Sequence, residues 1–143
     1  AGIKKGSVYY FEEQTLTSPE PHFFIVLNKN PKTEELLILV CASSQVTKRT
    51  QVVQKLGFPP ATLVFVSPKE FPLFTKPTVI DCNQVFEKTV QSLIEKLNNK
   101  KLGVCVEIMP DSIITKLVDG VLKSSQVPED IQDILREDIT INA

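Results

Sequence analysis

Two short apolar runs separated by a polar segment constrain the fold of this chain more than any other feature. Residues 23–27 and 36–40 are aromatic, β-branched or leucine throughout, whereas residues 28–33 carry asparagine, lysine and proline, which favour turns. The pattern predicts two buried strands joined as an antiparallel hairpin. Because the outer ends of a hairpin lie side by side, His22 before the first strand should lie near the polar residues 41–45 after the second.

Other parts of the chain also have the composition of short strands. They are rich in β-branched and aromatic residues and are bounded by glycine, proline or polar residues. They comprise residues 6–11, 62–66, 77–81 and 102–108. Three prolines between residues 66 and 78 exclude a helix in that interval, and short strands interrupted by prolines favour a small barrel.

Helical spacing of apolar residues replaces the strand pattern in three segments. The first runs from Gln84 to the pair Asn98 and Asn99. Pro110 and Pro128 each open a further helical pattern, as expected for proline in the first turn of a helix. We therefore predict an α+β chain, namely a small antiparallel β-barrel with added helices that are mostly C-terminal.

The length of 143 residues fits a single domain with its own core. We expect residues 1–109 to form the barrel with one inserted helix and residues 110–143 to form a helical extension. No apolar run approaches the roughly 20 residues of a membrane-spanning helix, so no membrane partner is expected. The N-terminus shows no targeting segment, and three cysteines placed singly in apolar surroundings suit a reducing compartment, so we expect a cytoplasmic protein.

Charge is distributed unevenly along the chain. Residues 1–109 contain 13 Lys and Arg against 10 Asp and Glu, whereas residues 110–143 contain 3 against 7. A basic body with an acidic tail is compatible with a polyanion-binding face that is partly screened by its own C-terminus. The alternative is an ordinary solvated surface with a chance asymmetry, and charge alone favours that alternative.

Several common kinds of site have no counterpart in the sequence. The five glycines are scattered, whereas nucleotide-binding loops need clustered glycines so that backbone amides can approach phosphate. One histidine and three dispersed cysteines offer no zinc-site spacing. The paired carboxylates at residues 12–13 and 34–35 are expected to be solvated. We therefore expect neither a cofactor nor a metal.

The remaining candidates for chemistry lie at the outer end of the hairpin: His22, Ser43, Ser44 and Gln45, with Lys48 and Arg49 just beyond. Metal-free RNA cleavage needs an acid and a base, together with groups that hold the phosphate as charge develops. His22 is suited to the role of acid or base, because an unperturbed imidazole titrates near neutrality. Ser43 and Ser44 are candidate catalytic donors to the phosphate. Gln45, Lys48 and Arg49 are candidate RNA-binding groups.

The order of several segments resembles the PemK/MazF family of toxin-antitoxin ribonucleases. Residues 5–9 resemble its first strand, which has a basic residue and glycine at its start, and residues 24–28 resemble its apolar second strand. Residues 37–45 resemble the strand that runs into a polar hydroxyl cluster, and residues 79–85 resemble a strand that leads through an Asp-Gln element into a helix. The resemblance, over residues 4 to about 97, implies an SH3-like barrel, commonly a homodimer with an antitoxin protein as partner, that cuts single-stranded RNA without metal.

One departure from the family pattern leaves two hypotheses open. The family's first loop usually carries a catalytic arginine before proline, but residues 15–21 contain no basic residue. Ser43 occupies the position of the family's functional threonine, and His22 lies near the Arg-Pro position. Either the catalytic set is rebuilt around His22 with Lys48 or Arg49, or the chain is an inactive SH3-like module that binds a peptide or antitoxin.

Overall fold

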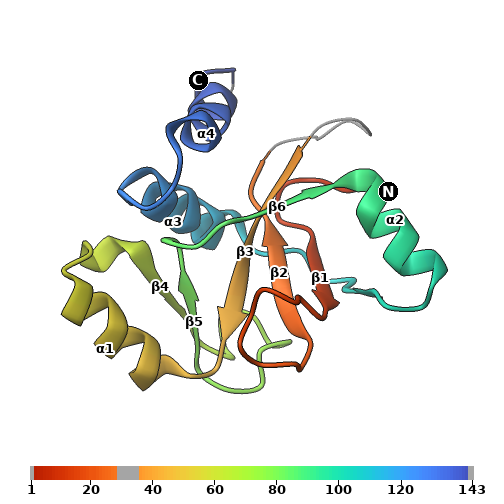
Figure 1. Cartoon of the computed structure of the whole chain (residues 1–143), viewed down its shortest axis with the longest axis horizontal. Helices are drawn as coiled ribbons and strands as arrows, with labels where there is room; N and C mark the ends of the chain where they lie inside the picture. Colours follow the sequence, from red (N-terminus) through yellow and green to blue (C-terminus); the bar gives the residue numbers. More distant parts are fainter. Residues whose placement is uncertain (1, 29–35, 142–143) are drawn as a thin grey trace.

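A seven-stranded antiparallel sheet with four α-helices makes up the part of the chain that the computed structural model describes, residues 2–28 and 36–141 (Figure 1). The strands are β1 (Val8–Phe11), β2 (His22–Val26), β3 (Leu36–Ser43), β4 (Leu63–Val66), β5 (Thr78–Asp81), β6 (Phe86–Thr89) and β7 (Gly103–Val104). The helices are α1 (Val46–Leu56), α2 (Val90–Asn98), α3 (Asp111–Leu122) and α4 (Glu129–Ile141), with a 3-10 turn η1 (Pro60–Thr62). The predicted α+β class is confirmed.

Strand β3 organises the sheet, whose order is β4-β5-β3-β2-β1-β7. One edge of β3 pairs with β2, while the other edge pairs first with β6 and then, through Ala42 and Ser43, with β5. In the described part of the chain no pairing joins β4 to β7, so the sheet is open. None of the described helices is long and apolar enough to cross a membrane.

The predicted hairpin of residues 23–27 and 36–40 is confirmed, with Phe24 opposite Cys41 and Val26 opposite Leu39. The turn expected at residues 28–33 falls mainly outside the described residues. Strand β3 runs to Ser43, beyond its predicted end, because pairing with β5 satisfies the backbone of Ala42 and Ser43. These two residues are therefore part of the strand and do not follow it.

Two helices differ from the sequence-based expectation. The helix expected from Gln84 begins only at Val90, because β6 pairs with β3 and the Thr89 side chain then accepts a hydrogen bond from the Ser92 amide at 3.0 Å as a helix cap. Helix α1 was not expected, since only Val53 on it is buried and its apolar stripe is weak. Residues 1–109 thus contain two α-helices where one was predicted.

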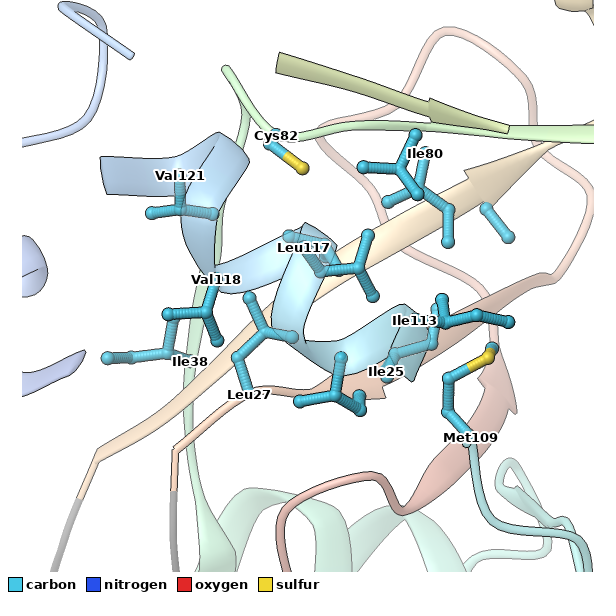
Figure 2. Packing of buried hydrophobic residues seen from close by; sticks show 14 of the residues in the cluster. Ile25, Leu27, Ile38, Ile80, Cys82, Met109, Ile113, Leu117, Val118 and Val121 are labelled. Atoms are coloured by element: carbon cyan, nitrogen blue, oxygen red, sulfur yellow. The ribbon is translucent and has the colours of Figure 1, made fainter. Parts of the chain in front are cut away.

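The apolar runs of the hairpin are continuous because both faces of the central strands are buried. On β2, Ile25 belongs to the core beneath α3, whereas Phe24 and Val26 belong to the core beneath α2. Figure 2 shows side chains of α3 directed toward the central strands: Ile113, Leu117 and Val118 beside Ile25, Leu27 and Ile38. The C-terminal helices, which begin directly after Pro110 and Pro128, therefore share one core with the sheet.

Gly120 lets α3 pack closely against η1 and Cys82. A Cβ atom at this position would lie 2.8 Å from the carbonyl oxygen of Ala61 and 2.9 Å from the Sγ atom of Cys82. Both neighbours are fixed, because Ala61 contributes backbone and Cys82 is fully buried. Helix α3 can thus lie against η1 only with glycine at this position.

We expect Gly120→Ala to lower the free energy of unfolding by about 1–3 kcal/mol through overpacking, although alanine favours helix by roughly 1 kcal/mol in exposed positions. Urea unfolding monitored by circular dichroism measures this difference. Ser112→Ala, at an exposed position of the same helix, is the control and should change stability little. A Gly120→Ala protein as stable as the parent would show that α3 does not approach η1 as closely as described.

Candidate functional site

A groove of about 420 Å³ opens at the end of the sheet where β2 begins and β3 ends. Its walls come from the loop between β1 and β2, the end of β3 with the start of α1, and the loop that precedes β5. These segments lie together at the lower end of the molecule in Figure 1, while α4 lies at the opposite end. The groove is lined by all six predicted site residues: His22, Ser43, Ser44, Gln45, Lys48 and Arg49.

Strand register explains why His22 and Ser43 share this groove. The last pair of the β2–β3 ladder is Phe24 opposite Cys41, and His22 and Ser43 each lie two residues beyond this pair, at the same end of the hairpin. Directly opposite residues of antiparallel strands have side chains on the same face. At its C-terminal end β3 no longer pairs with β2 but pairs with β5, with Ser43 opposite Val79. The groove opens where the β2–β3 ladder ends.

The half-buried His22 side chain has a defined orientation. Its Nδ1 atom lies 2.8 Å from the backbone carbonyl oxygen of Glu20. A carbonyl oxygen only accepts hydrogen bonds, so Nδ1 carries the hydrogen in this contact. In the neutral ring the Nε2 atom is then the one with a free lone pair, and it can accept a proton from a bound substrate.

Helix α1 begins directly at the groove. Ser43 Oγ accepts a hydrogen bond from the Gln45 amide at 3.1 Å, and the first intrahelical bond runs from the Arg49 amide to the Gln45 carbonyl at 3.1 Å. The amides of residues 46–48 precede that bond and have no acceptor within the helix. No acidic side chain occupies the first turn of α1. The positive end of α1 therefore adds to the attraction of an anion into this groove.

Three cations line the groove: Lys48, Arg49 and Lys76. Lys48 and Lys76 are exposed, whereas Arg49 is half-buried, and no described residue forms a hydrogen bond or ion pair with its guanidinium group. Burial raises the pKa of the neighbouring Cys41 thiol to about 12, and the charge of Arg49 opposes that shift only in part. Cys41 is therefore a neutral thiol and not a nucleophile at neutral pH.

The groove contains residues that sequence analysis did not select. The rings of Tyr10 and Phe74 both contact the Phe23 ring, with centroids 4.6 Å and 5.4 Å from it, and Lys76 follows Phe74 in the loop before β5. The only signal for Phe74 and Lys76 in the sequence is an aromatic and basic segment between Pro72 and Pro77. Nothing in that segment indicates that it faces His22, because the contact depends on the pairing of β5 with β3.

Acidic groups at this end of the molecule are few. Glu20 and Asp81 line the groove, but one oxygen of Asp81 accepts hydrogen bonds from the backbone amide and the side chain of Asn83, both at 2.9 Å. Within the described residues, no group of three or more His, Cys, Asp or Glu side chains could hold a metal ion. The groove thus presents three cations, hydroxyls and one imidazole to a ligand, together with the carboxylates of Glu20 and Asp81.

Glu13 corrects one sequence-based expectation, since it is buried and not solvated. Its carboxylate lies 2.6 Å from Lys88 Nζ and accepts a hydrogen bond from Thr15 Oγ1 at 2.7 Å. Burial raises the pKa of this carboxyl, but the hydrogen bonds from Lys88 and Thr15 outweigh burial and hold the pKa below its ordinary value of 4.5. The contacts fix the start of the loop between β1 and β2, which forms one wall of the groove. Residues 34–35, the other acidic pair, lie outside the described residues.

We expect Glu13→Gln to lower the free energy of unfolding by about 1–3 kcal/mol at neutral pH, because Lys88 loses its partner. Since the folded-state pKa is lowered, the stabilisation by Glu13 is complete above about pH 4.5 and is lost as pH falls through the folded-state pKa. Unfolding curves from pH 7 to pH 3 should therefore converge for the two proteins. Glu12→Gln, an exposed neighbour, is the control, and an equal effect of both changes would contradict the assignment.

The three cysteines are free, and the pKa of each thiol is raised, chiefly by burial.

No model of a known protein family and no curated protein matches this chain. The resemblance to the PemK/MazF family therefore remains a prediction.

Proposed function

We propose that this chain is a metal-independent endoribonuclease that cleaves single-stranded RNA, as a toxin of the PemK/MazF kind. One observation carries the proposal: a single groove collects an imidazole with a free Nε2 atom, two serine hydroxyls and three cations. These groups come from separate segments of the chain, and they match the needs of phosphate transfer from a ribose hydroxyl.

The proposed reaction uses the RNA itself as nucleophile. His22 Nε2 takes the proton of the ribose 2′-hydroxyl, the 2′-oxygen forms a bond to phosphorus, and the bond from phosphorus to the 5′-oxygen breaks. The leaving 5′-oxygen takes a proton from water in the open groove, and the hydroxide that remains takes the proton from the His22 imidazolium, which restores the neutral ring. Arg49 and Lys76 offset the negative charge that develops on the phosphate oxygens, and Ser43 and Ser44 donate hydrogen bonds to them. The products are a 2′,3′-cyclic phosphate and a free 5′-hydroxyl.

The aromatic residues of the groove favour single-stranded RNA as the substrate. Tyr10 is partly exposed beside Phe23 and offers a surface on which an unpaired base can stack. A base within a duplex is stacked on its neighbours and is not available for this contact. Lys48 and Gln45 lie exposed at the start of α1 and provide the contacts to neighbouring phosphates.

The proposal also includes an SH3-like barrel fold and a cytoplasmic location. An SH3-like barrel agrees with the role of β3, which pairs along one edge with both β6 and β5 and so serves two parts of a curved sheet. A cytoplasmic location agrees with three free cysteines and with RNA as the substrate.

The test is cleavage of a mixed-sequence single-stranded RNA by the purified chain in the presence of EDTA. Cleavage with cyclic-phosphate ends is the expected result, because the mechanism uses the 2′-hydroxyl and needs no metal. A matched DNA strand, which lacks that hydroxyl, should remain whole. RNA that stays intact at high enzyme concentration, or cleavage that stops on addition of EDTA, would overturn the proposal.

A second candidate function is a non-catalytic protein-interaction module, and exposed apolar side chains on the edge strand β7 and just after it favour it. Val104 lies on β7, which pairs with β1, and Val106 and Ile108 follow in the segment after this strand; Val106 is 90% exposed. An unpaired edge with apolar side chains is a common site of strand addition. An antitoxin protein or a second copy of this chain in a homodimer would bind there. Intact RNA together with a stable complex that Val106→Asp abolishes is the result expected for this candidate.

A further inference from the structure

A second cavity, of about 950 Å³, lies next to the groove. It is bounded by the end of β1, residues 12–15, Lys88 on β6, and the C-terminal end of α2 with the segment that leads to β7. In Figure 1, α2 and this segment lie on the β1 side of the sheet. Tyr10 and Pro21 line both the cavity and the groove, so the two hollows meet at these residues.

Lysine side chains dominate the charge of this cavity. Four lysines line it, Lys88, Lys96, Lys100 and Lys101, against two carboxylates, Glu12 and Glu13. Lys88 neutralises Glu13 at 2.6 Å. The other three lysines form no ion pair with any described residue, so the cavity retains excess positive charge.

The end of α2 holds these lysines in place. The Lys100 amide donates to the Leu97 carbonyl at 3.1 Å, and the Lys101 amide donates to the Lys96 carbonyl at 2.8 Å. Lys96 Nζ lies 5.5 Å from the centre of the Phe11 ring, which directs this side chain over β1. These hydrogen bonds therefore fix the backbone positions of Lys96, Lys100 and Lys101, and the contact with Phe11 also fixes the side chain of Lys96.

We propose that Lys96, Lys100 and Lys101, the lysine cleft, bind the phosphates of the RNA strand as it leaves the groove across Tyr10. This inference rests on the proposed ribonuclease function and adds the path of the substrate beyond the cleaved bond. Tyr10 is 39% exposed at the boundary of the two hollows, where a base can stack between one phosphate in the groove and the next phosphates in the lysine cleft. Alternation of aromatic and cationic groups suits a ribose-phosphate chain with unpaired bases.

The experiment measures binding of a fluorescent single-stranded DNA oligonucleotide, which cannot be cleaved through a 2′-hydroxyl, between 0.05 M and 1 M salt. Each lost phosphate contact on a single strand reduces the slope of log K against log salt by about 0.7, so Lys96→Gln/Lys100→Gln/Lys101→Gln should reduce it by about 2. The loss of affinity in this variant, relative to the parent, should therefore be roughly 100-fold larger at 0.1 M salt than at 1 M salt. Lys55→Gln/Lys69→Gln/Lys116→Gln, which removes the same charge from exposed sites outside both hollows, should leave the slope nearly unchanged.

Every other outcome would overturn the proposal that the lysine cleft binds the phosphates of the RNA strand. Equal losses in the two triple variants would mean that only net charge matters, and an unchanged slope in the cleft variant would mean that the strand leaves the groove elsewhere. Displacement of the oligonucleotide by polyglutamate at equal charge concentration would indicate an acidic protein segment as the ligand. Lys100→Gln/Lys101→Gln, at two exposed positions, replaces the triple variant if circular dichroism shows a disturbed fold, and it should reduce the slope by about 1.4.

Failure of this inference and failure of the proposed function are distinguishable. The binding experiment involves no cleavage, so an inactive protein can still show the slope change in the cleft variant alone. Conversely, RNA cleavage in EDTA would support the ribonuclease function. If the cleft variant then showed no change in slope, RNA binding by the lysine cleft would be rejected while that function stood.

Discussion

His22→Ala is expected to lower the rate of RNA cleavage about 10²–10⁴-fold, the usual contribution of a general base. The reason is that His22 Nε2 is the group assigned to take the 2′-hydroxyl proton, while the 2.8 Å contact of Nδ1 with the Glu20 carbonyl fixes the ring. The change should leave the fold intact, because the side chain lies at the open end of β2 and the core begins at Phe24.

Single-turnover cleavage of a fixed RNA in EDTA measures this effect, with circular dichroism as the check on folding. Glu20→Ala is the matched control. It removes a groove side chain but keeps the backbone carbonyl that orients His22, so its rate should stay close to that of the parent. Parental activity in the His22→Ala protein would eliminate the proposed base, and equal losses in both variants would indicate a disturbed loop.

Arg49→Gln is expected to lower the cleavage rate about 10²–10³-fold, the loss typical of one group that stabilises a developing oxyanion. Arg49 is half-buried and has neither a hydrogen bond nor an ion pair with a described residue, so its charge is available to the groove. Water shields a charge less in a partly buried position than on the surface. Lys48→Gln, one residue away and exposed, is the comparison and should cost only a few-fold.

Separate measurement of kcat and KM tests the assignment of Arg49. Loss mainly in kcat is expected, because the charge on the phosphate oxygens grows in the transition state. Arg49→Lys should recover part of the rate, since it restores the charge but not the planar fork of donors. Similar, purely KM effects at Arg49 and Lys48 would reassign both residues to simple RNA binding.

Local patterns in the sequence were sufficient for the hairpin and the last two helices. The two apolar runs are close in sequence and pair with each other as an antiparallel hairpin, and Pro110 and Pro128 directly precede the last two helices. The same locality explains why His22 and Ser43 could be placed on one groove, because both lie two residues beyond the last pair of the hairpin, at its open end.

Long-range pairing overrode local patterns elsewhere. Residues 86–89 have apolar spacing that suits a helix, but the free edge of β3 pairs with them as β6, which also buries Phe86. Strand β3 runs on to Ser43 for the same reason, since β5 supplies its partner. Helix α1 has too few buried side chains to give a clear periodic pattern.

The sequence by itself determined the α+β class, the central hairpin and the six candidate residues at its open end, because each depends on contacts between residues close in the chain. Only the tertiary structure decided that Lys76 and Phe74 face those residues, that Glu13 is buried against Lys88, and that α3 fits against η1 at Gly120. Each of those contacts joins segments far apart in sequence. Their positions follow from how strands pair and helices pack, which no local pattern of residues encodes.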